Sequence, residues 1–354
     1  MKWEDNIRKV IPYVPGEQPN IEGMIKINTN ENPYPPSPKV REVLDSIDCT
    51  KNRLYPDPTI KILVDALAKT YNVPSERVFV GIGSDDVLAM SFMTFFNSDK
   101  PILFADITYS FYDVWAEEFR IPYKTVPLND DFTMNFDGFC VENGGVVIAN
   151  PNAPTGLYEG LDEIERVIKA NPDVVVIVDE AYIDFGGKSA LSLIDKYENL
   201  LVVQTFSKSR SMAGARIGFA IGQEKLIKYL QDVKYSYNSY TMDMTTQQVG
   251  AAVLSDPQYF ADTCKKIIAT RERTKTRLTE LGFTYPDSMS NFIFATHESV
   301  PAVKIFEALR ERKIFVRYFS SPRISNYLRI TIGTDEEMDK VIAALGEIIA
   351  EYSR

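Results

Sequence analysis

The 354-residue sequence has a single histidine, His297, and three widely separated cysteines, Cys49, Cys140 and Cys264. One histidine cannot form a multi-histidine metal site. Three cysteines without a CxxC pair favour neither a thiolate metal site nor a disulfide framework. His297 precedes Glu298 in a segment that is typical of a surface loop, so we expect no catalytic role for it. The cysteine usage fits a reducing compartment, and we expect a cytoplasmic protein without a bound metal.

Positive charge and long hydrophobic runs are also scarce. Lysine and arginine number 39 against 49 aspartates and glutamates, which gives a net charge of −10. Such an excess of negative charge disfavours a nucleic-acid partner, which needs a basic surface. No run approaches the length of about 18 apolar residues that a membrane span requires. The opening, MKWEDNIRKV, is too polar for a signal peptide. We therefore expect neither a nucleic-acid nor a membrane partner.

Short β-branched runs recur along the first two thirds of the chain, with amphipathic or capped helical segments between most of them. The runs are VFVGI (78–82), PILFA (101–105), VVIAN (146–150), VVVIVD (174–179), LLVVQTF (200–206) and RIGFAI (216–221). Continuous apolar strands interleaved with helices are typical of a mostly parallel sheet that is covered on both faces. The sequence therefore predicts an α/β fold.

The pattern changes near residue 245, and the chain is longer than one compact core usually allows. A long helical stretch begins at Pro257, and the last helix opens with a capping box formed by Thr334 and Glu337. Earlier, Ser37 is expected to cap a helix that has Pro38 at its first position. The expected division is an N-terminal arm with part of the small domain (1–35), a large domain (36–245) and a smaller α+β domain (246–354).

The strand VVVIVD leads directly into polar residues that fit a cofactor. In sheets of this kind, ligands bind beyond the carboxyl ends of the strands. Asp179 would cost free energy there if it stayed unpaired, but it would be satisfied opposite a protonated pyridine nitrogen. Tyr182, three residues later, can hydrogen-bond a phenolic oxygen of the same ring. The DEAY run alone could equally well form a surface turn.

A second strand, LLVVQTF, leads into the run SKSRSMAGARIG (207–218). Lys208 directly follows the buried strand, where desolvation can remove its proton and make it a nucleophilic amine. Thr205, Ser207 and Arg216 add hydroxyl and guanidinium donors at a spacing that suits a phosphate monoester. The pattern SKxxxxAGxRxG, 29 residues after DEAY, predicts a phosphorylated cofactor that is bound to a lysine.

Two further strand ends carry weaker signals. GIGSDD (81–86) offers glycines that allow close backbone approach, and a helix N-terminus that attracts phosphate. It does not match a dinucleotide fingerprint, because Asp86 takes the place of the third glycine. NPNAPTG (150–156) by itself predicts only a turn.

Together these segments resemble fold type I pyridoxal-phosphate enzymes, and specifically the histidinol-phosphate aminotransferases, over essentially the whole chain. The resemblance rests on IPYVPG (11–16), NENP (30–33), LYPDP (54–58), GSDD (83–86), TYSFY (108–112), PNAPTG (151–156), DEAY (179–182), FSKSRSMAGARIG (206–218) and VR…LRITIGT (316–334). It implies a large domain built on a mostly parallel sheet covered by helices, and a smaller α+β domain. It also implies a homodimer with shared active sites.

The resemblance further implies that pyridoxal phosphate is held as a Schiff base on Lys208, with Asp179 at the pyridine nitrogen and Tyr182 at the ring oxygen. The other residues that it assigns to the cofactor are Tyr109 on the ring face, Ser84, Asp85, Thr205, Ser207 and Arg216 at the phosphate, and Tyr55 at the phosphate of the neighbouring subunit's cofactor. The family's loop has an asparagine directly before PTG, where this chain has Ala153, and Asn152 is the expected substitute.

The implied reaction joins an amino donor and a 2-oxo acid: L-histidinol phosphate and 2-oxoglutarate exchange with imidazole-acetol phosphate and L-glutamate, in histidine biosynthesis. Arg317 and Arg329, with Tyr13 nearby, are implied to hold the anionic end of the substrate. The alternatives are a broad-range aromatic aminotransferase, a lyase resembling phosphothreonine decarboxylase, and a binding protein without turnover. The intact lysine, aspartate and tyrosine of the cofactor site disfavour the last of these.

Overall fold

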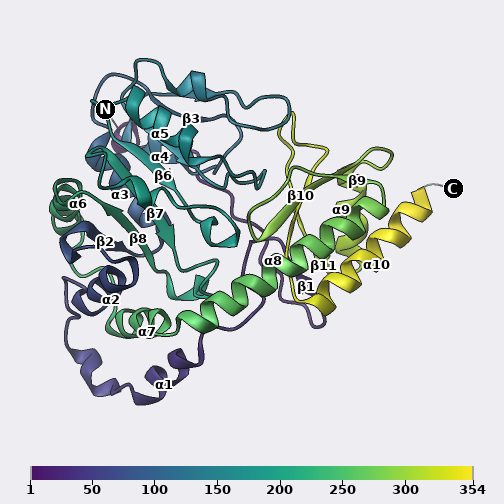
Figure 1. Cartoon of the computed structure of the whole chain (residues 1–354), viewed down its shortest axis with the longest axis horizontal. Helices are drawn as coiled ribbons and strands as arrows, with labels where there is room; N and C mark the ends of the chain where they lie inside the picture. The colour runs from purple at the N-terminus through teal and green to yellow at the C-terminus, as the bar shows by residue number, and fades with distance from the viewer. Residues whose placement is uncertain (1, 353–354) are drawn as a thin grey trace.

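A seven-stranded sheet forms the centre of the computed structural model, which describes residues 2–352 (Figure 1). Its strand order is β2-β8-β7-β6-β5-β3-β4, and β8 runs antiparallel to both of its neighbours while the other pairs are parallel. The strands are β2 (Val78–Gly81), β3 (Ile102–Ala105), β4 (Tyr123–Val126), β5 (Val146–Ala149), β6 (Val176–Asp179), β7 (Leu200–Thr205) and β8 (Gly218–Gly222). The predicted α/β fold with a mostly parallel sheet is confirmed.

Helices cover both faces of this sheet because its inner strands are apolar along their whole length. In β6, Val176 and Val178 pack into the core of one face, and Ile177 packs into the core of the other. The first face is covered by α2 (Lys61–Tyr71), α5 (Leu161–Ala170) and α7 (Met244–Leu254), and the second by α3 (Ser84–Phe95), α4 (Tyr112–Phe119) and α6 (Glu224–Tyr237). Alternation of side chains along each strand thus builds two cores from one sheet.

The outer helix α1 (Pro38–Ser46) packs against α7 and begins as the sequence predicts. The Ser37 hydroxyl accepts the amide of Lys39 at 3.2 Å, and Pro38 is the first helical residue. The edge strand β4 was not predicted from the sequence. Its two middle residues, Lys124 and Thr125, are exposed, so the segment offers no apolar run.

A second, antiparallel sheet has the strand order β12-β13-β10-β9. The elements of this part are β9 (Phe283–Thr284), β10 (Phe292–His297), β12 (Arg317–Tyr318), β13 (Leu328–Thr331), α8 (Pro257–Glu280), α9 (Ala302–Glu311) and α10 (Asp335–Tyr352). The capping box before α10 is confirmed: the Thr334 amide donates to the Glu337 carboxylate at 2.7 Å, and the Glu337 amide donates to the Thr334 hydroxyl at 3.3 Å.

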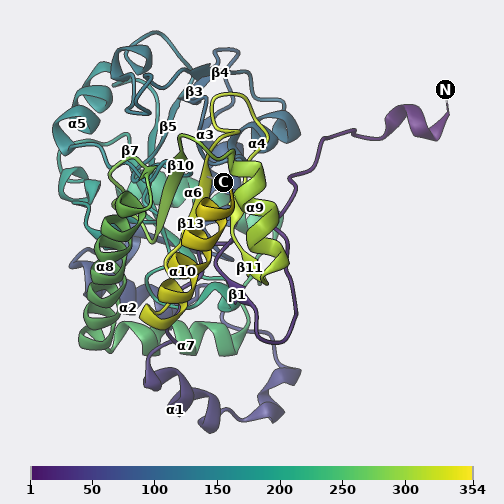
Figure 2. The same ribbon diagram turned by 90° about the vertical axis from the view of Figure 1, so that its right-hand side faces the viewer.

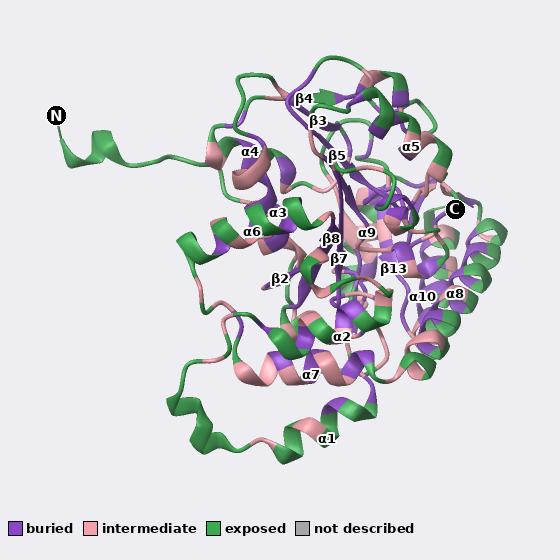
Figure 3. Cartoon of the chain, turned by 60° about the vertical axis from the view of Figure 1, so that its left-hand side comes forward, coloured by how far each residue is buried: buried purple, intermediate pink, exposed green. Residues whose placement is uncertain are grey.

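An early segment of the chain joins this second part. Strand β1 (Ile25–Lys26) pairs in parallel with β11 (Ile314–Phe315). The next residues contact both sheets: the Asn30 amide bonds to Thr331 of β13, and the Thr29 carbonyl accepts Lys208, which follows β7. The chain begins with an exposed arm that extends away from the body (Figures 2 and 3) and returns to it by Tyr13, which is half-buried against Phe111.

His297 does not lie in a surface loop, and that expectation was wrong. It ends β10 and is buried. Its Nδ1 accepts the amides of Ser299 and Val300 at 3.2 Å each, and its Nε2 contacts the Leu281 carbonyl at 3.1 Å. The turn after the strand folds back over the ring, which gives this histidine a structural role.

Within residues 2–352, no helix combines the length and the apolar character that crossing a membrane would require.

Candidate active site

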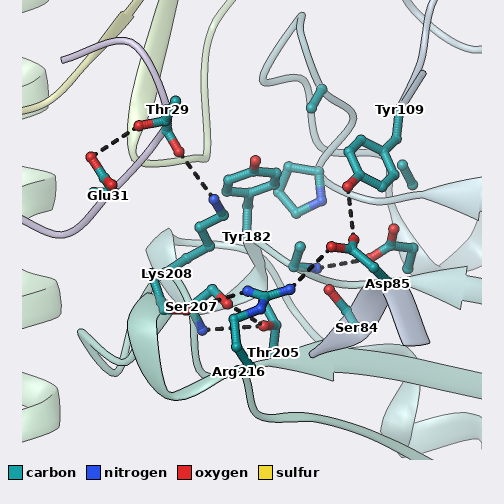
Figure 4. Close-up of a pocket in the computed structure, with 16 residues that line it drawn as sticks. Thr29, Glu31, Ser84, Asp85, Tyr109, Tyr182, Thr205, Ser207, Lys208 and Arg216 are labelled. Atoms are coloured by element: carbon teal, nitrogen blue, oxygen red, sulfur yellow. Dashed lines mark hydrogen bonds and ion pairs between the residues drawn. The ribbon is translucent and has the colours of Figure 1, made fainter. Parts of the chain in front are cut away.

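A cavity of about 170 Å³ lies at the carboxyl edge of the central sheet (Figure 4). Because β2, β3, β5, β6 and β7 are parallel, the residues that follow them converge at this edge. The reversed strand β8 contributes residues that precede it. Of the residues expected at the site, the cavity wall contains Ser84, Asp85, Tyr109, Asp179, Tyr182, Thr205, Ser207, Lys208 and Arg216.

Lys208 reaches into this cavity from the end of β7. Its Nζ donates to the Thr29 carbonyl at 3.2 Å and lies 5.9 Å from the centre of the Tyr182 ring. Among the residues that the structure describes, no carboxylate pairs with this amine. Burial, with a further contribution from the positive charge of Arg329, lowers the pKa of Lys208 to about 8. The arrangement therefore makes the neutral, nucleophilic form of this amine more accessible than in an ordinary lysine.

Asp179 is the last residue of β6 and is buried in the cavity wall. Its Oδ2 accepts the Tyr112 hydroxyl at 2.7 Å, and its Oδ1 accepts the Ala181 amide at 3.2 Å. Burial raises the pKa of Asp179 to about 6. No basic side chain within residues 2–352 forms an ion pair with it, so a cation in the cavity would find a ready partner.

The N-terminus of α3 forms one wall of the cavity. Ser84 is its first residue, and Gly83 before it has a φ of 87°, which few residues other than glycine adopt. Gly218 lies so close that a Cβ on it would be 2.2 Å from the Ser84 amide nitrogen. Glycine at these two positions keeps the first amides of the helix accessible, where they can bind an anion.

Side-chain donors complete this anion-binding end. Arg216 contacts Asp85 at 3.2 Å, and the hydroxyls of Thr205 and Ser207 lie 3.0 Å apart. The Tyr109 hydroxyl donates to the other oxygen of Asp85 at 2.8 Å. Asp85 thus links the arginine to the tyrosine, and the guanidinium lies directly against the helix end, where a Cβ on Gly83 would be 2.6 Å from Nη2 of Arg216 (Figure 4).

Arg317 and Arg329 lie directly opposite each other on the antiparallel strands β12 and β13. Like charges in such a pair destabilise a sheet. Arg329 donates to the Asn28 carbonyl at 3.1 Å, but its buried Nε has no partner. Neither arginine forms an ion pair with any described residue. Since the Thr29 carbonyl accepts Lys208, Arg329 is anchored one residue away from the lysine's own partner. Two guanidinium groups without ion-pair partners can together bind an anion.

Tyr13 lies near this pair. Its ring stacks on Phe111 at 4.1 Å, and together with Arg317 it lines a second cavity of about 770 Å³. Tyr109 lines both cavities, so the larger one adjoins the smaller.

Tyr55 does not line the cavity of its own chain. Its side chain is 81% exposed, and its ring lies 4.7 Å from that of Tyr240. From this exposed position the side chain can contact a neighbouring subunit. Its role at the neighbour's cofactor stays a prediction.

Asn152 does not line the cavity either, and its assignment to the cofactor needs correction. Its amide donates to the Ile107 carbonyl at 2.9 Å and to the Thr155 hydroxyl at 3.2 Å, while its oxygen accepts the Thr108 hydroxyl at 2.7 Å. These bonds within the loops use up the amide. The wall is formed instead by Pro151 and Ala153, its neighbours in the chain.

Sequence reasoning missed three residues of the site: Thr29 and Glu31 in the wall, and Tyr112 behind Asp179. All three lie in or beside motifs that carry the resemblance, NENP and TYSFY. The motifs gave no signal for their roles, because each contact joins segments that are distant in the chain.

The strand order, the lysine and aspartate in one cavity and the anion-binding helix end define a fold type I transferase. The chain belongs to the aminotransferase class I and II family, whose model matches residues 22–345. It is 51% identical over 349 residues to the histidinol-phosphate aminotransferase of Lactococcus lactis subsp. cremoris (strain MG1363), which covers 99% of this chain and 98% of that relative. Identity to the histidinol-phosphate aminotransferase of Clostridium acetobutylicum is 52% over 348 residues, or 98% of this chain and 99% of the relative.

Among solved structures, the histidinol-phosphate aminotransferase from Sinorhizobium meliloti in complex with pyridoxal-5'-phosphate aligns with a TM-score of 0.84 and 26% identity. The alignment covers 93% of this chain and 91% of that one. The family resemblance and the fold type are thereby confirmed.

Proposed function

We propose that the chain transfers the amino group of L-histidinol phosphate to 2-oxoglutarate, using pyridoxal phosphate held on Lys208, in histidine biosynthesis. The observation that carries the proposal is the presence, in one cavity, of an amine without a carboxylate partner and of buried Asp179 without a cationic partner among the described residues. The substrate is supported by the 51% and 52% identity, over nearly the full length, to relatives with this name.

The residues of the cavity fit the cofactor at three points. Asp179 would hold the protonated ring nitrogen, and the amine of Lys208 would bond to the aldehyde carbon. The amides of Ser84 and Asp85, together with Thr205, Ser207 and Arg216, would bind the phosphate. When bound, the cofactor supplies an electron-withdrawing ring that takes up the electron pair released at the α-carbon of the substrate.

Lys208 also moves the proton. With a pKa of about 8, it is neutral in roughly one molecule in ten at pH 7, about 300 times more often than a lysine with the ordinary value. With its amine free, Nζ would accept the proton from the α-carbon of the substrate and deliver it to the aldehyde carbon of the cofactor. Tyr109, fixed by its bond to Asp85, would cover one face of the ring.

Arg317 and Arg329 would bind the anionic end of each substrate in turn. The phosphate of histidinol phosphate and the side-chain carboxylate of glutamate both offer paired oxygens to a guanidinium. An anion between the arginines would also relieve their mutual repulsion across β12 and β13. Tyr13, which lines the adjoining cavity with Arg317, would border the bound substrate.

We also propose a cytoplasmic homodimer in which Tyr55 reaches the cofactor phosphate of the partner. Support comes from the exposure of Tyr55 and of two apolar neighbours, Leu54 (51%) and Tyr240 (47%), which a second copy would cover. The proposed domains remain an arm with part of the small domain (1–35), a large domain (36–245) and a small domain (246–354). Helix α7 spans the boundary between residues 245 and 246 and packs against α1 and α2 of the large domain.

The proposal is tested by presenting the purified enzyme with histidinol phosphate, phenylalanine, tyrosine and phosphothreonine in separate single-turnover reactions. We expect histidinol phosphate to react faster than the other three amines and to form imidazole-acetol phosphate. Glutamate should form once 2-oxoglutarate is added, and no carbon dioxide should be released. Faster turnover of phenylalanine or tyrosine would assign a broad aromatic aminotransferase. Carbon dioxide released from phosphothreonine would assign a lyase.

A further inference from the structure

The hydroxyl of Tyr182 has a protein partner that the proposed cofactor chemistry does not use. It accepts a hydrogen bond from Nδ2 of Asn30 at 2.8 Å. Asn30 is buried, and its φ of 56° lies in the left-handed region, which asparagine tolerates better than most residues. A buried asparagine held in this conformation beside a cavity residue suggests a specific task.

The amide of Asn30 can point in only one direction. The Thr331 hydroxyl accepts the Asn30 backbone amide at 3.1 Å, and among the described residues its proton has no acceptor other than Oδ1 of Asn30 at 3.0 Å. The Asn291 side chain also donates to the Asn30 carbonyl at 3.0 Å. With Oδ1 fixed as an acceptor, Nδ2 must face Tyr182 as a donor.

This bond decides where the proton of the Tyr182 hydroxyl can go. An amide nitrogen cannot accept, so the hydroxyl cannot donate back to Asn30. Within residues 2–352, the hydroxyl has no other hydrogen-bond partner, and Tyr182 lines the cavity. Its proton is therefore available to an acceptor in the cavity. A hydroxyl that accepts one hydrogen bond also becomes a stronger donor in the next.

We propose that Asn30 is a positioning residue that directs and strengthens the donation from Tyr182 to the ring oxygen of the cofactor. The inference rests on the proposed function. It also explains how the site manages without a second donor: Ala153 has none to offer, and the amide of Asn152 is used up within its loop. Thr331 lies two residues after Arg329 on β13, so one strand carries both the anion-binding arginine and the support of Asn30.

The test is a pH titration of the visible absorbance of the bound cofactor in Asn30→Gly. Glycine removes the side chain and accepts the left-handed backbone without strain. A hydrogen bond to the ring oxygen stabilises its anionic form, which lowers the proton affinity of the neighbouring nitrogen of Lys208. Weakening that bond should raise the midpoint of the titration by about 0.3 to 1 pH unit. Tyr182→Phe should raise it further, and adding Asn30→Gly to Tyr182→Phe should change nothing more.

Asn28→Ala is the matched control. This asparagine is also buried and lies two residues earlier, but its side chain donates to the Glu17 carbonyl, away from Tyr182. Its midpoint should equal that of the wild type. The inference is overturned if Asn30→Gly keeps the wild-type midpoint, or if it shifts the midpoint equally with and without Tyr182. A wild-type protein that shows no absorbance from a lysine-bound cofactor would overturn the proposed function as well, so the two failures are distinguishable.

Discussion

Replacing Arg329 with methionine should abolish efficient use of anionic substrates without weakening the fold. Methionine keeps much of the length of the side chain and removes the charge. Arg329 faces Arg317 across β12 and β13, has a buried Nε without a partner and forms no ion pair with the described residues. The protein supplies hydrogen-bond and ion-pair partners to an arginine that has only a structural role. For an arginine that binds a ligand, the ligand supplies some of these partners.

The expected effect is large for catalysis and small for stability. Losing a charge-assisted bidentate contact should cost about 2–4 kcal/mol of transition-state stabilisation, which lowers kcat/KM for histidinol phosphate roughly 30- to 1000-fold. The 2-oxoglutarate half-reaction should weaken as well. The substitution removes the cross-strand repulsion and the unpaired Nε, but it also leaves the Asn28 carbonyl without its donor. These effects oppose each other, so the free energy of unfolding should change by less than about 1 kcal/mol in either direction.

The assay pairs steady-state kinetics on both substrates with urea unfolding. Arg271→Met is the control, because Arg271 is a buried arginine that the fold satisfies: it donates to the carbonyls of Phe185 at 2.9 Å and Ser290 at 2.8 Å. Leaving those carbonyls unpaired should cost about 2–4 kcal/mol of stability. Unaltered kinetics of Arg329→Met on both anionic substrates would refute the reasoning. So would a loss of stability equal to that of the control.

Four further outcomes follow from the site. Borohydride should fix the cofactor on Lys208, as peptide mass spectrometry would reveal, and an adduct on another lysine would contradict the assignment. Asp179→Asn should slow turnover at least about a hundredfold in a folded protein, and near-normal activity would show that the ring nitrogen is managed otherwise. Burial raises the pKa of Asp179 from 3.8 to about 6, so the folded cofactor-free protein holds this proton more tightly than the unfolded chain. The resulting stability is fully present below about pH 4 and is lost as the pH rises through 6. In urea unfolding of the cofactor-free proteins, the free energy of unfolding of Asp179→Asn should therefore depend less on pH in that window than that of the wild type. An equal pH dependence would mean that the stabilising proton is bound by a group other than Asp179. Mixing Tyr55→Phe with Lys208→Ala chains should give more activity than either parent, since one site of each mixed dimer carries neither defect. No gain after verified subunit exchange would mean that Tyr55 acts within its own chain.

Sequence reasoning succeeded where a local rule fixes the position. Asp179 ends one buried strand and Lys208 follows another, and parallel strands bring such residues to one edge. It failed where a contact depends on the return of a distant segment, as between Thr29 and Lys208, which are 179 residues apart. It also failed for Asn152, because competing hydrogen bonds within a loop decide where an amide points, and no pattern in the sequence records that competition.

The pairing of β1 with β11 has a consequence for the order in which the enzyme becomes functional. Residues 25–31 are held by partners near the other end of the chain: Ile25 and Ile27 donate to the carbonyls of Lys313 and Phe315, and Asn30 bonds to Thr331, 301 residues away. These partners are among the last parts of the chain to be synthesised. Arg329, whose positive charge contributes to the lowered pKa of Lys208, belongs to the same late part of the chain. The full lowering of the pKa of Lys208 therefore requires a nearly complete chain.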